Sequence, residues 1–298
     1  MNRSLLGASL IAISGTVLSA QTQGPPMGWV GAVDGLYSYQ GRADLGDGGS
    51  FSAKRSFVRA GGLYRFENGF SAGVFASAGQ LDYDFDTSGV QPWGDVTDLR
   101  VSIPMRYRFQ NGVSLFFAPS LRFDYEAGAS MSDGRSYGAF AGITWRVNDK
   151  LSIGPGFGAF SQFEDDDTQV FAALLIDWDI SKRWNLSTGR GLGASQGPGL
   201  SLSYAHSDAL RFSLLARYEE LRFRLDNQGP APNGVGQDKS IPVVFAVEYN
   251  PSPALSLTAF AGAEFNGELQ LESSSGAVLS TQNYETAPLI GFAFRLAF

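Results

Sequence analysis

The stretch from Ala287 to Phe298 reads APLIGFAFRLAF and alternates between large and small side chains. A β-strand points successive side chains to opposite faces. One face would carry large apolar groups, namely Ile290, Phe292, Phe294, Leu296 and Phe298. The other would carry small groups and one charge, namely Gly291, Ala293, Arg295 and Ala297. Such a strand at a chain end is unusual for a water-soluble domain, whose termini are generally loose and polar.

The composition favours many short strands joined by tight turns. The 298 residues include 37 Gly, 23 Phe and 11 Tyr, which are residue types enriched in turns and strands. Charged residues make up only 17%, which is low for a surface that faces water. The absence of Cys and the presence of one His exclude disulfides, thiol chemistry and a multi-histidine zinc site. The net charge of −7 argues against nucleic acid as a partner.

The amino terminus has the features of a secretion signal. Arg3 precedes an apolar run, Leu5 to Val17, which small residues follow. The run is shorter than the roughly 20 residues of a membrane-spanning helix, which is the alternative reading. We therefore expect residues 1–20 to be a signal peptide, residues 21–28 a short periplasmic leader, and residues 29–298 the folded domain. No later segment approaches 18 apolar residues in a row, so a membrane-spanning domain would be a β-barrel.

Two kinds of connection alternate along the chain. Short turns lie near residues 68, 111, 149, 182, 207 and 251, and two of them contain Asn-Gly, which supplies the positive φ angles of tight hairpins. Longer loops lie near residues 45, 91, 131, 165, 194, 233 and 277. Six turns and seven loops join fourteen antiparallel strands and place both chain ends on the turn side. The strands within residues 184–206 are the weakest, so twelve strands is the alternative.

One expected strand, Phe70 to Asp86, shows an irregular pattern. Its apolar parity changes at Gly79-Gln80, from Phe70, Ala72, Val74, Ala76 and Ala78 to Leu81, Tyr83 and Phe85. An extra residue in one strand shifts the parity of all that follow, so the pattern predicts a β-bulge at this position.

Aromatic residues collect near both ends of the expected strands. Those beside turns or termini are Trp29, Phe66, Phe109, Trp145, Trp178, Trp184, Tyr204, Tyr249 and Phe298. Those toward the loops are Tyr39, Tyr83, Phe85, Phe123, Tyr125, Tyr137, Tyr218, Phe265 and Tyr284. Two aromatic girdles around an aliphatic band are typical of a membrane barrel. A soluble β-sandwich would need many Lys and Glu on the other parity, which instead is rich in Gly, Ser and Ala.

These features resemble bacterial outer-membrane β-barrel proteins, whose last residue is typically Phe. The resemblance covers the mature chain in architecture, and its specific element is Phe298 with its strand. It implies an all-β, antiparallel transmembrane barrel of about 14 strands in the bacterial outer membrane. It also implies contact with outer-membrane lipid and lipopolysaccharide, and recognition of Phe298 by the barrel-assembly machinery.

Charged residues recur on the inward parity, and we expect them to line a pore. They are Arg59, Arg100, Arg106, Arg108, Arg122, Asp124, Glu126, Arg146, Asp177, Asp179, Arg217, Glu248, Glu264 and Arg295. Arginines of the first half of the chain would face carboxylates of the second half, which resembles the transverse charge arrangement of general diffusion porins. The alternative is that the charges pair with one another and brace a closed lumen.

Strand number and length bear on the function. Eight strands leave an interior filled by side chains and sixteen leave an aqueous channel, so fourteen lie between. The mature length resembles monomeric fourteen-stranded porins, whereas the leader is too short for the amino-terminal hatch of fatty-acid transport barrels. We expect a passive pore for small hydrophilic solutes. The alternative is a non-conducting structural or surface-interaction barrel.

We expect no catalytic, metal or cofactor site. His206, Ser207 and Asp208 are triad residue types, but neighbours in a tight turn do not readily adopt triad geometry. The glycines between Gly189 and Gly199 lack the strand-to-helix context of a nucleotide loop. Acidic residues of the outer rim suit divalent cations that bridge lipopolysaccharide, or a solvated loop; they are Asp82, Asp84, Asp86, Glu164, Asp165, Asp166 and Asp167.

The facing assignment predicts the effect of a charge in the membrane band. Leu174→Arg and Phe245→Arg should each cost roughly 2–4 kcal/mol of unfolding free energy if these positions face lipid at mid-bilayer. Urea titration in lipid vesicles measures that cost, and heat-modifiable migration on a gel reports the folded barrel. An unchanged unfolding free energy in both variants would contradict the facing assignment.

Overall fold

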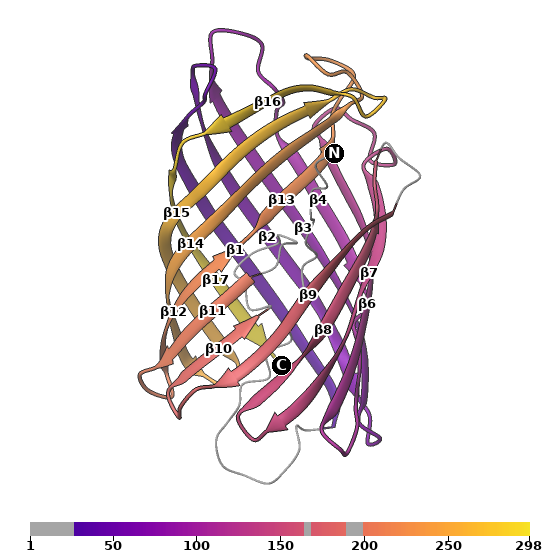
Figure 1. Cartoon of the computed structure of the whole chain (residues 1–298), viewed down its shortest axis with the longest axis vertical. Coiled ribbons are helices and arrows are strands. Elements are labelled where there is room, and N and C mark those ends of the chain that lie inside the picture. Colours follow the sequence, from indigo (N-terminus) through magenta and orange to yellow (C-terminus); the bar gives the residue numbers. More distant parts are fainter. Residues whose placement is uncertain (1–26, 164–167, 189–198) are drawn as a thin grey trace.

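The computed structural model describes residues 27–163, 168–188 and 199–298, which form strands joined by turns and loops (Figure 1). The predicted signal peptide and nearly all of the leader lie outside these residues. So do the acidic residues 164–167 and most of the glycine-rich segment before Gly199. In the described part of the chain no helix is long and apolar enough to cross a lipid bilayer.

Seventeen strand segments make one sheet. They are β1 (Gly28–Asp44), β2 (Ser50–Arg65), β3 (Phe70–Asp86), β4 (Val96–Ser102), β5 (Met105–Arg108), β6 (Val113–Glu126), β7 (Arg135–Asn148), β8 (Leu151–Ser161), β9 (Thr168–Asp179), β10 (Trp184–Thr188), β11 (Gly199–Ala205), β12 (Leu210–Arg217), β13 (Glu219–Arg224), β14 (Val235–Ser252), β15 (Leu255–Glu272), β16 (Val278–Tyr284) and β17 (Ala287–Ala297).

Three pairs of segments are single barrel strands with a short interruption. β4 and β5 both pair with β3 and β6, β12 and β13 both pair with β14, and β16 and β17 both pair with β15. Counting each pair once gives fourteen antiparallel barrel strands, so the predicted number is confirmed and the alternative of twelve is wrong. The only parallel pairing between described strands is one bridge, from Arg224 to Tyr125.

The first and last strands close the barrel. β1 pairs with β17 in an unbroken register from Ala32 opposite Ala297 to Gln40 opposite Leu289. Beyond it, the Gly31 amide donates to the Phe298 carbonyl at 2.7 Å, and the Phe298 amide donates to the Gly31 carbonyl at 3.0 Å. The predicted closing strand therefore has a paired backbone up to its last residue.

Short turns gather at one end of the barrel, the turn end, and longer loops at the other, the loop end (Figure 1). Gly69 and Gly112 have φ angles of 82° and 85°, which an L side chain adopts only with strain. The side-chain oxygen of the preceding Asn accepts from the next strand in both turns, at 3.1 Å for Asn68 and 3.2 Å for Asn111. Both predicted Asn-Gly hairpins are confirmed.

The outward parity forms an exposed apolar belt. Its members include Val58, Val74, Val101, Leu115, Phe117, Phe157, Leu174, Leu214, Phe245, Ile290 and Phe292. Most of the aromatic residues predicted for the turn side are exposed as well, namely Trp29, Phe66, Phe109, Trp145, Trp178, Trp184, Tyr249 and Phe298. A surface this apolar is stable against lipid and not against water. The fold is that of bacterial outer-membrane β-barrels.

The predicted bulge at Gly79-Gln80 is wrong. β3 pairs with β2 without a register shift from Asp86 to Ser71, so Leu81, Tyr83 and Phe85 lie on the inward face. The apolar parity changes because the interior itself becomes apolar toward the loop end. A bulge occurs instead in β15, where Asn266 has a φ of 51° and the register with β14 shifts.

Inward side chains of the loop half pack into an apolar cluster that we call the plug. It consists of Ala43, Leu45, Phe51, Ala53, Leu81, Tyr83, Phe85, Trp93, Val96, Phe223, Leu225, Ala231, Leu269, Leu271, Tyr284 and Ala287. The rings of Tyr83 and Phe85 each meet the Trp93 ring edge-on, at 5.7 and 5.6 Å between centroids. Tyr83, Phe85 and Tyr284 therefore fill the interior, and their predicted place in the outer girdle is wrong.

β13 separates the plug from the far wall. Phe223 points into the plug and meets Trp93 at 5.2 Å between ring centroids. Arg224 points the other way and donates to the Phe163 carbonyl beside the end of β8, at 3.3 Å. The Asp226 amide donates to the Glu126 carboxylate of β6 at 2.9 Å. β13 thus crosses the loop end from β14 to β6, as the leaning strands of Figure 1 show.

The closing contact generates a prediction about assembly. Phe298→Ala keeps both backbone hydrogen bonds to Gly31 and removes only the ring. If the ring is the signal read by the assembly machinery, the variant should accumulate less folded barrel in cells and refold normally from urea into detergent. Heat-modifiable migration of both samples measures the two yields. Equal loss in cells and in detergent would instead make the ring a packing element.

Candidate functional site

One buried ion-pair network lies beneath the plug. The Arg55 guanidinium of β2 pairs with Glu264 of β15, and it also donates to Gln40 at 2.9 Å and to Asp238 at 3.3 Å. The Asp238 carboxylate further accepts from the Tyr83 and Tyr284 hydroxyls, at 2.9 and 3.1 Å. Glu264 is fully buried. An unpaired charge here would be costly, so each charge of the network depends on the others.

A second buried network joins β4 and β6. Arg122 donates to Asp98 at 2.8 Å and to Asp124 at 2.9 Å, and Arg100 lies 3.7 Å from Asp98. Both carboxylates are 1% exposed. Glu126, further along β6, accepts from the backbone amides of Gly94 and Asp226 and so fastens two loop segments. In the loop half the predicted residues Arg100, Arg122, Asp124 and Glu264 lie in ion pairs, and Glu126 accepts from backbone amides; a pore-lining role for all five stays a prediction.

In the turn half of the interior, inward charges are exposed and not buried. Arg106, Arg108 and Arg146 point inward and are nevertheless exposed, and so are Asp177 and Asp179. A barrel filled by side chains would bury inward charges. Their exposure means that water reaches these inward side chains from the turn end of the barrel.

Four inward arginines gather on one side of this open region, and we call them the arginine belt: Arg65, Arg106, Arg108 and Arg146. Ser71 of β3 is the cross-strand partner of Arg65 on β2 and of Arg106 on β5, so it lies between the two arginines. Arg108 and Thr144 both lie opposite Ser114, and Arg146 follows two residues after Thr144. Among the described residues none of the four belongs to an ion pair. The belt is a fixed concentration of positive charge in a lumen that water reaches.

The remaining predicted residues pair locally. Arg59 and Arg295 share Asp34, Arg295 at 3.5 Å, and Glu248 lies 3.7 Å from Arg211. Asp177 and Asp179 both accept from the Asn185 amide at 2.9 Å. Arg217 is partly exposed on the inward face of β12. The predicted pairing of first-half arginines with second-half carboxylates thus occurs at Arg55 with Glu264 and Asp238, and elsewhere local pairs replace it, apart from the arginine belt. A pore-lining role for these residues stays a prediction.

An aromatic wall lies above the belt. The rings of Phe116, Phe140, Phe171 and Phe160 form a row of nearly parallel planes on β6–β9, with centroids 5.3, 5.8 and 6.2 Å apart. Each ring lies where the Cβ of a glycine on an adjacent strand would be, for example Phe116 over Gly142 and Phe140 over Gly156. A ring that lies over a glycine lies flat along the wall. Phe140 and Phe171 are buried within this row, and Phe116 and Phe160 are partly exposed, so those two are the rings that the lumen can reach.

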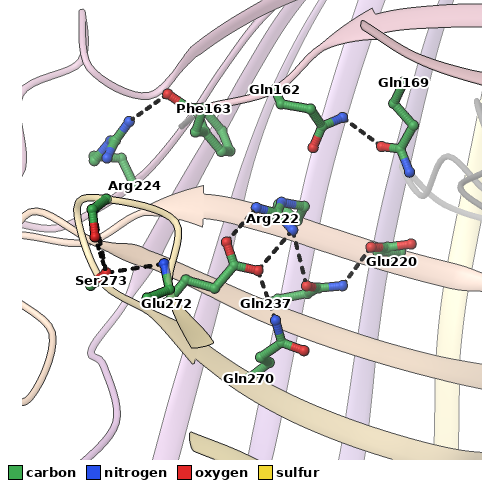
Figure 2. Close-up of polar contacts among 12 residues, drawn as sticks. Gln162, Phe163, Gln169, Glu220, Arg222, Arg224, Gln237, Gln270, Glu272 and Ser273 are labelled. Carbon is green, nitrogen blue, oxygen red and sulfur yellow. Dashed lines mark hydrogen bonds and ion pairs between the residues drawn. The ribbon is translucent and has the colours of Figure 1, made fainter. Parts of the chain in front are cut away.

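Two polar rows face one another at the loop half (Figure 2). On β13–β15, Arg222 forms a bidentate pair with Glu272, at 3.0 and 2.7 Å, and donates to Gln237, which donates to Glu220. On the inward face of β8–β9, Gln162 donates to Gln169. Among described residues, β9 pairs with β8 from Thr168 to Trp178 but with β10 only from Asp177 to Asp179. We call these two polar rows together the side passage.

Sequence reasoning missed four charged residues of the interior. Arg55, Asp98, Asp238 and Arg222 carry the buried networks and the side passage, yet none was among the predicted site residues. Alternation does assign Arg55 to the inward face, which is the signal that was available. Its partner Glu264 is 209 residues away, and alternation does not say at which height along the barrel either residue lies.

Known proteins share this fold and not its sequence. No protein-family model matches the chain, and no curated protein matches its sequence. Among solved structures, an outer membrane channel from Pseudomonas putida F1 aligns with a TM-score of 0.50 and 12% identity, over 93% of this chain and 97% of that one. The P. putida toluene transporter TodX aligns at 0.47 and 9%, over 92% and 91%. The KdgM porin aligns at 0.36 and 12%, over 88% and 97%. The similarity to the first shows the fold alone.

No group of three or more potential metal-binding side chains occurs in the described ranges. His206 lies between the rings of Tyr204 and Phe212, with centroids 6.4 and 6.1 Å away. Ser207 accepts the Leu210 amide at 3.1 Å. The three triad residue types of this turn are thus partly accounted for by packing and turn hydrogen bonds.

The buried network generates a stability prediction. Arg55→Met should lower the free energy of unfolding by about 3–5 kcal/mol, because it leaves Glu264 and Asp238 buried without their cation. Arg42→Met is the matched control, since its pair with Asp86 is solvent-exposed and should cost about 0–1 kcal/mol. Urea unfolding in vesicles gives both values. Equal costs would contradict a bracing role.

Proposed function

We propose that the protein is a passive channel that carries small hydrophilic solutes across the outer membrane. The observation that supports it most is the exposure of inward charges in the turn half, above all Arg106, Arg108 and Arg146. Water and ions reach a lumen only where side chains leave it open. Charges without ion-pair partners in such a space stabilise passing solutes of opposite sign.

The proposed route bypasses the plug. The plug fills the interior enclosed by β13–β15 and β1–β4, so a straight axial route would have to displace fully buried rings such as Phe51 and Phe223. The side passage is instead lined by partly exposed polar groups, among them Gln162, Gln169 and Arg222. A solute would enter at the loop end between β13 and β8–β9, and leave through the open turn half.

A non-conducting structural barrel is the second candidate. The plug and the two buried ion-pair networks favour it, because they stabilise the loop half without contributing to transport. The two functions differ in one measurable property, which is ion conductance across a bilayer.

Single-cysteine variants test the channel and its route together, because the chain contains no Cys. We expect step currents from the protein in a planar bilayer. An anionic thiol reagent should change the step size of Gln169→Cys in the side passage and of Thr144→Cys in the open lumen. It should leave Ala53→Cys unchanged, because Ala53 is 1% exposed within the plug.

The outcomes separate the two candidates. Absence of step currents at every voltage would favour the non-conducting barrel. Currents that respond at Ala53→Cys and not at Gln169→Cys would retain the channel and reject the side passage.

A further inference from the structure

We infer that the lumen contains a binding subsite for small aromatic carboxylates, formed by the aromatic wall and the arginine belt. The inference rests on the proposed function and deepens it, because it names a solute class for the same lumen. It joins two features that were described separately: a row of phenylalanine rings of which Phe116 is partly exposed, and a group of arginines that form no ion pair with another described residue.

The two features meet at one cross-strand pair. Arg106 of β5 and Phe116 of β6 lie directly opposite each other and both point inward. Directly opposed residues on adjacent antiparallel strands have their Cβ atoms roughly 4.5–5.5 Å apart. A guanidinium and a ring that extend from neighbouring Cβ atoms can contact the two parts of one small ligand, whose carboxylate is attached to, or one bond from, an aromatic ring.

The arginines would bind the carboxylate of the proposed ligand. The guanidinium presents N–H groups in a planar fork that matches the two oxygens of a carboxylate. Arg106 has Asp177 in its electrostatic surroundings, but Arg108 has Arg146 and Arg65 in its own. The local excess is therefore positive, and an anion would relieve the repulsion within the belt.

The phenylalanines would stack on the aromatic ring of the proposed ligand. Phe116 and Phe140 are nearly parallel, with an interplanar angle of 12°, and both lie flat over glycines. A flat ring face accepts a second ring in offset stacking, which is worth about 0.5–1.5 kcal/mol beyond area burial. Phe116 is partly exposed, so this face is within reach of the lumen.

Benzoate, acetate and benzyl alcohol are the probes, because each of the last two lacks one half of the proposed ligand. We expect benzoate to reduce the step current of the protein at a concentration about two- to twelvefold lower than acetate, which is the fold-change that about 0.5–1.5 kcal/mol of stacking gives. Benzyl alcohol should have little effect. Isothermal titration of the protein in detergent micelles gives the same affinities without requiring conductance.

Matched variants locate the subsite. Arg106→Gln should weaken benzoate binding about tenfold, and Arg106→Lys should weaken it less, because a charge remains. Phe116→Leu should weaken benzoate and leave acetate unchanged. Arg211→Gln is the control, because Arg211 is an inward arginine paired with Glu248 on β14, away from the aromatic wall. Heat-modifiable migration verifies that each variant is folded.

Failure of the channel proposal and failure of the subsite proposal give different experimental results. If no step current occurs but titration shows preferential benzoate binding that Arg106→Gln removes, the channel is rejected and the subsite stands. If currents occur while benzoate and acetate bind equally, or Arg106→Gln and Arg211→Gln behave alike, the subsite is rejected and the channel stands.

Discussion

Backbone hydrogen bonding in hydrocarbon is the constraint on which this structure depends. An unpaired amide or carbonyl in the bilayer costs several kcal/mol, so a sheet in lipid has to close on itself. The pairing of β1 with β17, completed by the two hydrogen bonds between Gly31 and Phe298, removes the last free edge at the turn end. Closure then gives every strand one face toward lipid and one face toward the interior.

The interior divides into two levels of opposite character. The loop half is apolar and ion-paired, with buried charges such as Glu264 and Asp98 that are stable only because Arg55 and Arg122 reach them. The turn half is charged and open to water. The buried ion pairs and the water-exposed arginines therefore lie at different heights of one barrel, and a substitution at one level need not disturb the other.

Local irregularities connect the two levels. The bulge at Asn266 in β15 and the register shift after Gln40 in β1 occur where β13–β15 begin to cross the loop end. Both shifts change the parity above them, which is how Ala43 and Leu269 come to face the plug. The same crossing turns Arg222 and Gln237 away from the plug and toward β8–β9.

Sequence alone determined the barrel, its fourteen strands, its Asn-Gly turns and the faces of most side chains, because alternation and turn chemistry are local. It placed Leu174 and Phe245 outward and Arg106 inward. Tertiary structure decided which inward side chains share a level, and so that Arg122 is buried in ion pairs while Arg106 faces water. It also decided that Leu81, Tyr83 and Phe85 fill the interior without a bulge. Level depends on the register between strands distant in sequence, which no local pattern specifies.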